Sequence, residues 1–292
     1  MGNWHPESPQ RLDAIGDQLL SSGLMPHLIE KDAGEASPAD ILRVHAPDYL
    51  AFLQQNAPNE GHYSIDGDTL MDPHTLPAAW AAAGAGISAV DAVMQGKGET
   101  AFCAVRPPGH HARPAQAMGF CFFNNIAVAA TYALETYGLK RVAIIDFDVH
   151  HGNGTEEIFE HDERVLMCSF YQHPLFPAEV RECQSSNMVN VPVPAGTSAE
   201  ALRAIISEQW LPRLKAFAPE LLLISAGFDA HQEDDLGQLC LTEADYAWMT
   251  QQLLLQADDS AQGRVVSMLE GGYNLSALGR SVVAHIKALA KM

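Results

Sequence analysis

The chain has 292 residues, of which 47% are hydrophobic and 18% are charged, and 36 acidic against 17 basic side chains give a formal net charge of −19. A chain this acidic offers no general phosphate-binding surface, so we expect no direct nucleic-acid partner and only weak, salt-dependent attraction of cationic partners. Because the start of the sequence is polar, we expect no signal peptide, and we expect no apolar run to approach the roughly 20 residues of a membrane span.

Alternating strands and helices are predicted along the chain. Continuous apolar runs of the kind found in buried parallel strands occupy 101–105, 141–147, 164–170, 220–228 and 264–269. Helical spacing covers 124–138, 198–217, 242–258 and 275–292, with Ser198 and Thr242 as N-caps and Gly138 near a C-terminus. We therefore expect one α/β domain over 1–292, with a mostly parallel central sheet, helices on both faces and long loops at 57–77, 106–119 and 171–197.

The cysteine pattern indicates a reducing compartment. Five cysteines, none in a C-x-x-C pair, are typical of free, mostly buried thiols rather than of disulfides or a thiolate zinc site. We therefore expect a cytoplasmic protein without membrane association. The sequence leaves the oligomeric state open, a homo-oligomer included.

Polar motifs follow four of the predicted strands. They read "RPPGHH", "DFDVHH", "SAGFDAH" and "LEGGYN", and each stands where its strand ends. Ligands of α/β sheets bind at the carboxyl ends of the strands. The motifs therefore predict one site, assembled from four loops at one edge of the sheet.

The stretch "DFDVHH" predicts a divalent-metal site. In an extended chain Asp146, Asp148 and His150 share one face, and crowded carboxylates repel each other unless a cation lies beside them. Carboxylate and imidazole ligands suit a catalytic Zn²⁺, with Fe²⁺, Co²⁺ or Mn²⁺ as alternatives, and Asp229 is the best third ligand. Taken alone, the pattern also fits an exposed turn or a Ca²⁺- or Mg²⁺-binding loop.

The other motifs offer acid–base groups. The adjacent His110 and His111 on a Gly/Pro loop suit a general base and its electrostatic partner, with Asp146 and Asn153 available to orient them. Tyr273 follows two glycines and could donate a hydrogen bond to an oxyanion, although an isolated tyrosine is more often a packed core residue.

Together these motifs resemble the histone deacetylase family of the arginase/deacetylase fold, and in particular its class II-like bacterial amidohydrolases. The resemblance rests on "HPESPQRL", "RPPGHH", "GFCFFNN", "DFDVHHGNGT", "SAGFDAH" and "LEGGYN", which occur in the family's order from residue 5 to residue 274. It implies a zinc-dependent amidohydrolase in which metal-activated water removes acetyl or related acyl groups from lysine side chains.

The resemblance also implies a role for each matching residue. Asp148, His150 and Asp229 become the metal ligands. The catalytic residues become His111 as general base, His110 with Asp146, Asn153, and Tyr273 as the group that polarises the amide carbonyl. The substrate tunnel would be lined by Gly119, Phe120, Phe176, Leu236 and Asp68.

Structural potassium is a further implication of the resemblance. A first K⁺ would use Asp146, the hydroxyl of Ser169 and the carbonyls of Asp148, His150 and Phe170. A second would involve Phe159, Asp162, Val165 and Asn187. The family usually also has a strand before the "HPE" motif, so we expect either that the natural chain starts earlier or that its sheet lacks this strand.

Three rival functions remain. Polyamine-specific relatives carry an acidic gatekeeper where this chain has neutral Leu236, which favours an acylated lysine peptide or protein over a small acylated amine. The nearby acids at 233–235 keep an acetylpolyamine amidohydrolase open. A non-catalytic acyl-lysine binding protein is the second rival, and the two-metal arginase branch of the fold is the third.

Overall fold

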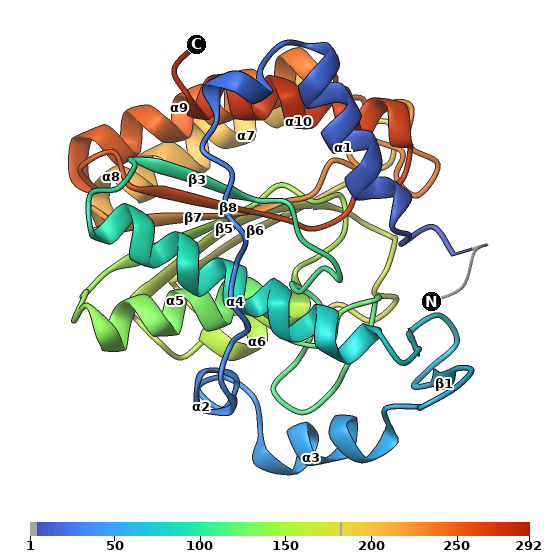
Figure 1. The fold of residues 1–292 in the computed structure, drawn as a ribbon. Helices are drawn as coiled ribbons and strands as arrows, with labels where there is room; N and C mark the ends of the chain where they lie inside the picture. The colour runs from blue at the N-terminus through green and yellow to red at the C-terminus, as the bar shows by residue number, and fades with distance from the viewer. Residues whose placement is uncertain (1–4, 182) are drawn as a thin grey trace.

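A six-stranded parallel sheet forms the centre of the protein, as the computed structural model of residues 5–181 and 183–292 shows (Figure 1). Its strands lie in the order β3-β8-β7-β4-β5-β6. In chain order they are β3 (Thr100–Cys103), β4 (Val142–Asp146), β5 (Val165–Gln172), β6 (Met188–Val193), β7 (Leu221–Ala226) and β8 (Val265–Leu269). Every residue of β4, β5, β7 and β8 is buried, which explains their continuous apolar sequences.

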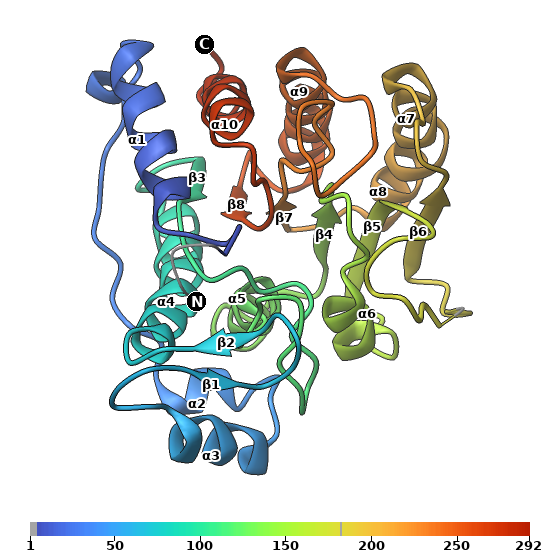
Figure 2. The same ribbon diagram turned by 90° about the vertical axis from the view of Figure 1, so that its right-hand side faces the viewer.

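Helices cover both faces of the sheet (Figure 2). One layer contains α1 (Gln10–Ser21), α7 (Ala199–Ile205), α8 (Leu211–Phe217), α9 (Glu243–Ser260) and α10 (Leu275–Leu289). The other contains α4 (Thr75–Met94), α5 (Asn125–Thr136) and α6 (Asn153–Phe159). The predicted α/β class with a parallel sheet and two helical layers is confirmed.

Smaller elements complete the chain. A short 3₁₀ helix, η1 (Met25–His27), follows α1, and a π-helical turn, η2 (Ile206–Trp210), joins α7 to α8. Below α4 and α5 in Figure 1 lie α2 (Pro38–Ile41), α3 (Pro47–Asn56) and the antiparallel pair β1 (Tyr63–Ser64) and β2 (Leu70–Met71).

The reversal of strand order occurs at β4. The chain passes from β4 through β5 to β6, returns on the other side of β4 as β7, and continues to β8. Asp146, the last residue of β4, stands opposite Ser169 of β5 and Ser225 of β7. The loops after β4 and β7 therefore diverge above this switch point, where such sheets bind their ligands.

Three expectations about the elements need correction. The segment 171–197 is not one long loop, because it contains β6. The strand predicted over 141–147 ends at Asp146, so Asp148 and His150 lie in the bend beyond it. The segment 57–77 is not one loop either, because it contains β1, β2 and the first residues of α4. Among the described residues β3 pairs with β8 alone and forms one edge of the sheet.

The membrane expectation was wrong in one respect. Helix α4 is long and apolar enough to cross a bilayer by length and composition, although 56% of its apolar window is buried inside the fold. Most of its buried residues are alanines and glycines, and the helix packs against α5, β3 and β8, as the core helix of a folded domain does.

Two histidines are buried where they stay neutral. His285 of α10 bridges two hydroxyls, with Nδ1 2.6 Å from Thr250 Oγ1 and Nε2 2.8 Å from Ser267 Oγ. Burial lowers the pKa of His285 to about 3 and that of His45 to about 4. Both imidazoles take up protons more readily in the unfolded chain than in the fold.

We therefore predict that the contribution of these two histidines to the free energy of unfolding falls as the pH drops from 6.5 towards 4. His285→Gln should reduce the difference in unfolding free energy between pH 7.5 and pH 5.0 by about 2 kcal/mol, because one buried neutral histidine is removed. Urea denaturation at both pH values measures this difference. His161→Gln, at an exposed imidazole, is the control, and equal pH dependence in the two variants would contradict the prediction.

Candidate active site

Two carboxylates and an imidazole meet above the switch point. Asp148 and His150 come from the loop after β4, and Asp229 comes from the loop after β7. One ligand atom from each lies within 4.8 Å of the others. His150 Nδ1 is 2.9 Å from Asp148 Oδ1 and 3.2 Å from Asp229 Oδ2. The structure thus brings together the three residues predicted to bind a metal.

The surroundings of this cluster fit a cation. Asp229 Oδ1 accepts the backbone N–H of Val149, but Oδ2 is fully buried and accepts no hydrogen bond, and its close polar contact is His150 Nδ1 at 3.2 Å. A buried carboxylate oxygen without a donor is costly unless a cation satisfies it. A set of two oxygens and one imidazole nitrogen, without sulfur, suits Zn²⁺ or a similar divalent metal.

Glycines make room for the two carboxylates. A Cβ on Gly271 would lie 1.8 Å from Asp229 Oδ2, and a Cβ on Gly227 would lie 2.1 Å from Asp148 Oδ2. The N–H of Gly271 also donates to Asp148 Oδ2 at 2.8 Å. The backbone at Gly227 and Gly271 therefore lies directly against Asp148 and Asp229, and only glycine fits at these two positions.

The charges of the cluster balance through His150. Burial, followed by the neighbouring Asp148, raises the pKa of Asp229 to about 6. Burial alone would lower the pKa of His150, but the contacts of its Nδ1 with Asp148 and Asp229 and the charges of these carboxylates raise it to about 10. A proton on His150 Nδ1 thus occupies the position between the carboxylates, and a divalent metal binding there would displace it.

The two adjacent histidines have opposite protonation preferences. His110 Nδ1 lies 2.9 Å from Asp146 Oδ2, and His111 Nδ1 lies 2.9 Å from the amide oxygen of Asn153. Burial lowers the pKa of His111, and the charges of His110 and His150 lower it further. Burial would also lower the pKa of His110, but Asp146, Asp148 and Glu270 outweigh it and raise that pKa well above the usual value. One imidazole is therefore charged beside a neutral one.

Sequence reasoning missed Glu270, which is fully buried behind the histidine loop. Its Oε2 accepts the backbone N–H groups of Gly109 (2.6 Å) and His110 (3.1 Å), and its Oε1 accepts the hydroxyl of Ser225 (3.2 Å). Burial raises its pKa to about 7. The available signal was a charged residue at the end of the otherwise apolar run "RVVSMLEGG".

Arg11 was missed as well, although it lies in the quoted "HPESPQRL" motif. Its guanidinium is fully buried, donates to the carbonyls of Gly272 (2.7 Å) and Glu270 (2.5 Å), and lies 5.0 Å from the centre of the Tyr273 ring. Burial raises the pKa of Tyr273 well above its usual value, even though Arg11 acts in the opposite direction. Tyr273 therefore keeps its hydroxyl proton and can donate it in a hydrogen bond.

Aromatic rings surround the histidines. The ring of Phe176 lies 4.9 Å from that of His111, and the ring of Phe120 lies 5.9 Å from that of Tyr273. A Cβ on Gly119 would collide with both His111 and Phe176, so the chain approaches them closely there. These three predicted wall residues therefore adjoin the catalytic candidates.

Asp68 approaches the same wall from the β1–β2 loop. Its carbonyl accepts a hydrogen bond from His5 Nε2, and its carboxylate accepts the hydroxyl of Thr69. The Phe120 N–H in turn donates to Thr69 Oγ1 at 3.3 Å. Thr69 thus links Asp68 to the Phe120 wall, and the role of Asp68 in substrate binding stays a prediction.

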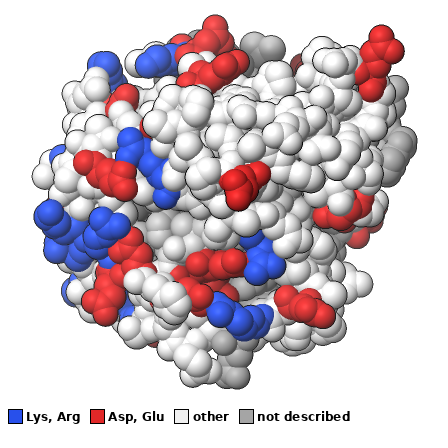
Figure 3. All heavy atoms as spheres, turned by 90° about the horizontal axis from the view of Figure 1, so that it is seen from below, with Lys and Arg blue, Asp and Glu red and all other residues white. Residues whose placement is uncertain are grey.

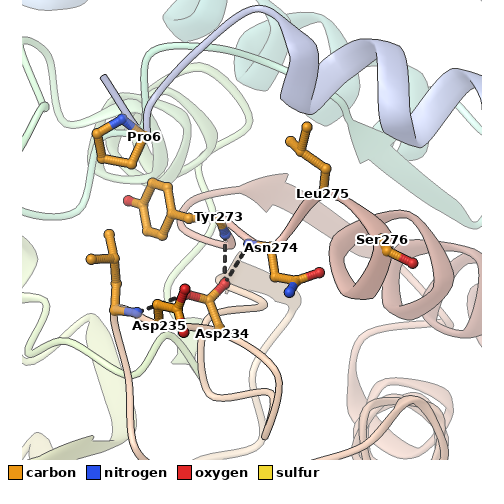
Figure 4. A pocket seen from close by; sticks show the side chains of 8 residues that line it. Pro6, Asp234, Asp235, Tyr273, Asn274, Leu275 and Ser276 are labelled. Atoms are coloured by element: carbon orange, nitrogen blue, oxygen red, sulfur yellow. Dashed lines mark hydrogen bonds between the residues drawn. The ribbon is translucent and has the colours of Figure 1, made fainter. Parts of the chain in front are cut away.

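A pocket of about 450 Å³ opens beside Tyr273 (Figure 4). Its lining residues are Pro6, Asp234, Asp235, Leu236, Tyr273, Asn274, Leu275 and Ser276. Asp234 is only 4% exposed, and Glu233 forms an ion pair with Arg280. Of the three acids at 233–235, only Asp235 is an exposed carboxylate for which the described residues supply no partner.

The residues of the two predicted potassium sites form two separate groups. Ser169 is next to Asp146 in the sheet, and its hydroxyl donates to Asn190 Oδ1 at 2.8 Å. Asn187 Nδ2 lies 2.8, 3.1 and 3.0 Å from the carbonyl oxygens of Phe159, Asp162 and Val165. An amide with two hydrogens thus faces three converging acceptors.

Comparison with known proteins identifies similar sequences across the whole chain. The sequence profile of the histone deacetylase domain matches residues 5–289. A probable deacetylase from Archaeoglobus fulgidus is 39% identical, with alignment over 93% of this chain and 77% of that protein. A histone deacetylase-like amidohydrolase from Pseudomonas aeruginosa is 38% identical over 92% of this chain and 73% of that protein.

A polyamine-specific relative and a solved structure are similar too. Polyamine deacetylase HDAC10 from Homo sapiens is 38% identical, covering 97% of this chain and 44% of that longer protein. The crystal structure of the HDA15 HD domain superposes with a TM-score of 0.91 at 35% identity, over 99% of this chain and 85% of that one.

Gly271→Ala should weaken metal binding by about 10- to 100-fold, because the added methyl displaces both carboxylates from the cluster. Chelator competition gives the dissociation constant for Zn²⁺, and urea denaturation checks that the variant folds. Gly67→Ala, where a Cβ meets open space, is the matched control. Unchanged affinity in the folded Gly271→Ala variant would contradict a metal site at these residues.

Proposed function

The chain belongs to the histone deacetylase family, and on that premise we propose that it is a metal-dependent amidohydrolase that removes acetyl or related acyl groups from lysine side chains. The observation that carries the proposal is the meeting of Asp148, His150 and Asp229 around a buried carboxylate oxygen that accepts no hydrogen bond, beside a neutral and a charged histidine.

In this proposal the three ligand residues hold Zn²⁺, with Fe²⁺ or another divalent ion as an alternative. When bound, such a metal supplies a Lewis acid for the acyl carbonyl and lowers the pKa of an adjacent water. The buried donor set and the glycine cradle around it support this assignment.

The protein side chains then divide the acid–base work. Because His111 donates its Nδ1 proton to Asn153, its Nε2 is free to accept the proton of the attacking water. Tyr273 donates its hydroxyl to the oxyanion that develops on the carbonyl. The imidazolium that His111 has become then protonates the departing amine. His110, held by Asp146, meanwhile keeps a positive charge near the developing negative charge.

An acyl-lysine peptide or protein suits the mouth of the site better than a cationic polyamine does. Leu236 is neutral, and two of its three acidic neighbours are already paired, Asp234 with backbone amides and Glu233 with Arg280. The competing function, an acetylpolyamine amidohydrolase, is supported by the similarity to the human polyamine deacetylase and by exposed Asp235.

Potassium binding and a cytoplasmic location are further parts of the proposal. The three carbonyls that converge near Asn187 suit a monovalent cation, and Asp146 with Ser169 would serve the site nearer the metal.

Acidic and basic side chains are interspersed on the face seen in Figure 3, which offers no broad basic surface for nucleic acid. Five free cysteines support a reducing compartment.

Tyr273→Phe should lower kcat on an acetyl-lysine peptide by about 100-fold or more, because one hydrogen-bond donor to the oxyanion is lost. KM and the bound metal should change little, since the ring and the ligands remain. Steady-state kinetics with elemental analysis measures all three. Turnover within about twofold of the parent protein would rule out this role for Tyr273.

A substrate comparison tests lysine against polyamine. The parent protein should show a higher kcat/KM on an acetyl-lysine peptide than on an acetylpolyamine, and Leu236→Glu should reverse the order by adding a carboxylate at the pocket. Leu236→Gln controls for size without charge. If the parent protein instead prefers the acetylpolyamine, the competing function is the right one, and Asp235 is the group that contacts the amine.

A further inference from the structure

We propose that Asp234 is a positioning residue that fixes the Tyr273 turn and the Leu236 loop relative to each other. The inference rests on the proposed function, in which Tyr273 donates to the oxyanion and Leu236 borders the substrate. It concerns a carboxylate that belongs to neither the metal cluster nor the histidine pair.

The carboxylate of Asp234 gathers three backbone N–H groups. Its Oδ2 accepts those of Tyr273 at 2.6 Å and Asn274 at 2.9 Å, and its Oδ1 accepts that of Leu236 at 3.0 Å. Figure 4 shows the carboxylate between the Tyr273 turn and its own loop. Charge-assisted hydrogen bonds of this kind are short and directional, so they fix the backbone from which both side chains project.

The Tyr273 turn needs such a restraint. Gly271 and Gly272 precede it, and Gly272 has a φ of +117°. Glycine can adopt many backbone conformations, so the chain that enters the turn is not held in one conformation by its own sequence. On the other side, Asn274 caps α10, with its Oδ1 accepting the N–H of Ala277 at 3.0 Å. Asp234 thus holds the junction between a flexible glycine pair and a rigid helix.

The same carboxylate is poorly placed to bind a substrate amine. It is 4% exposed, and both of its oxygens already accept backbone donors next to the positive N-terminal end of α10. The loop that carries Asp234 is also attached at Glu233. The carboxylate of Glu233 pairs with Arg280 of α10, and the backbone carbonyl of Glu233 accepts a hydrogen bond from the side-chain amide of Asn274. Loss of Asp234 should therefore loosen the turn without unfolding the protein.

A double-mutant cycle between Asp234 and Tyr273 tests the proposal. Asp234→Ala should lower kcat by about 10- to 100-fold when Tyr273 is present, because small displacements of a catalytic group have effects of this size. In the Tyr273→Phe background the same change should cost less than about threefold. Asp234→Asn should retain part of the activity, because its amide oxygen can still accept the N–H groups of Tyr273 and Asn274.

Two further measurements separate positioning from general damage. Amide hydrogen exchange should accelerate at 272–276 in Asp234→Ala, and the bound metal should stay at one equivalent. The matched control is Asp245→Asn, at a buried aspartate that accepts the N–H and hydroxyl of Thr242 at the start of α9, away from the pocket. Asp245→Asn should lower the free energy of unfolding. Any change that it causes in kcat should be the same in the parent and the Tyr273→Phe backgrounds.

The outcomes distinguish this inference from the proposed function. Equal losses of kcat in the parent and the Tyr273→Phe backgrounds, or unchanged exchange at 272–276, would overturn the positioning role alone. If Tyr273→Phe itself leaves kcat unchanged, the oxyanion role of Tyr273 fails, and the inference fails with it. If Asp234→Ala does not fold, Asp234→Asn carries the same cycle with a smaller expected loss.

Discussion

Burial of several carboxylates at one point of the sheet is the constraint on which the site depends. Asp146, Asp148, Asp229 and Glu270 are each at most 1% exposed. Their mutual repulsion in a low-dielectric interior is offset by backbone N–H donors and by imidazoles. At Asp229 Oδ2, which accepts no hydrogen bond, the offsetting group is the imidazole of His150, 3.2 Å away. In the proposed function a divalent metal replaces the His150 proton in this charge balance.

The same balance separates the roles of the two adjacent histidines. His110 faces the carboxylate of Asp146, whereas His111 faces the neutral amide of Asn153. Two identical side chains, adjacent in sequence, thereby acquire opposite protonation preferences. Burial and the charges of His110 and His150 keep His111 neutral, whereas Asp146, Asp148 and Glu270 keep His110 charged, so the surrounding charges decide which histidine is free to act as a base.

Much of this arrangement could be predicted from the sequence because it is local. The apolar strand runs marked β4, β5, β7 and β8, and "DFDVHH" with "SAGFDAH" marked the three residues that cluster at the strand ends. The missed features depend on contacts between distant segments. Glu270 acts on the histidine loop 160 residues away, and Asp234 acts on a turn 39 residues away. Strand β6 escaped because it is a partly exposed edge strand with a proline and an asparagine, so it lacks the continuous apolar run.

Metal dependence is the central claim, and a titration of metal-free protein tests it most directly. Protein stripped with a chelator would receive increasing Zn²⁺ while acetate release from an acetyl-lysine peptide is followed. The account predicts that activity is absent in the stripped protein and rises to a plateau at one equivalent of metal. Activity that survives complete removal of the metal, or a plateau only at two equivalents as in a two-metal site, would contradict it.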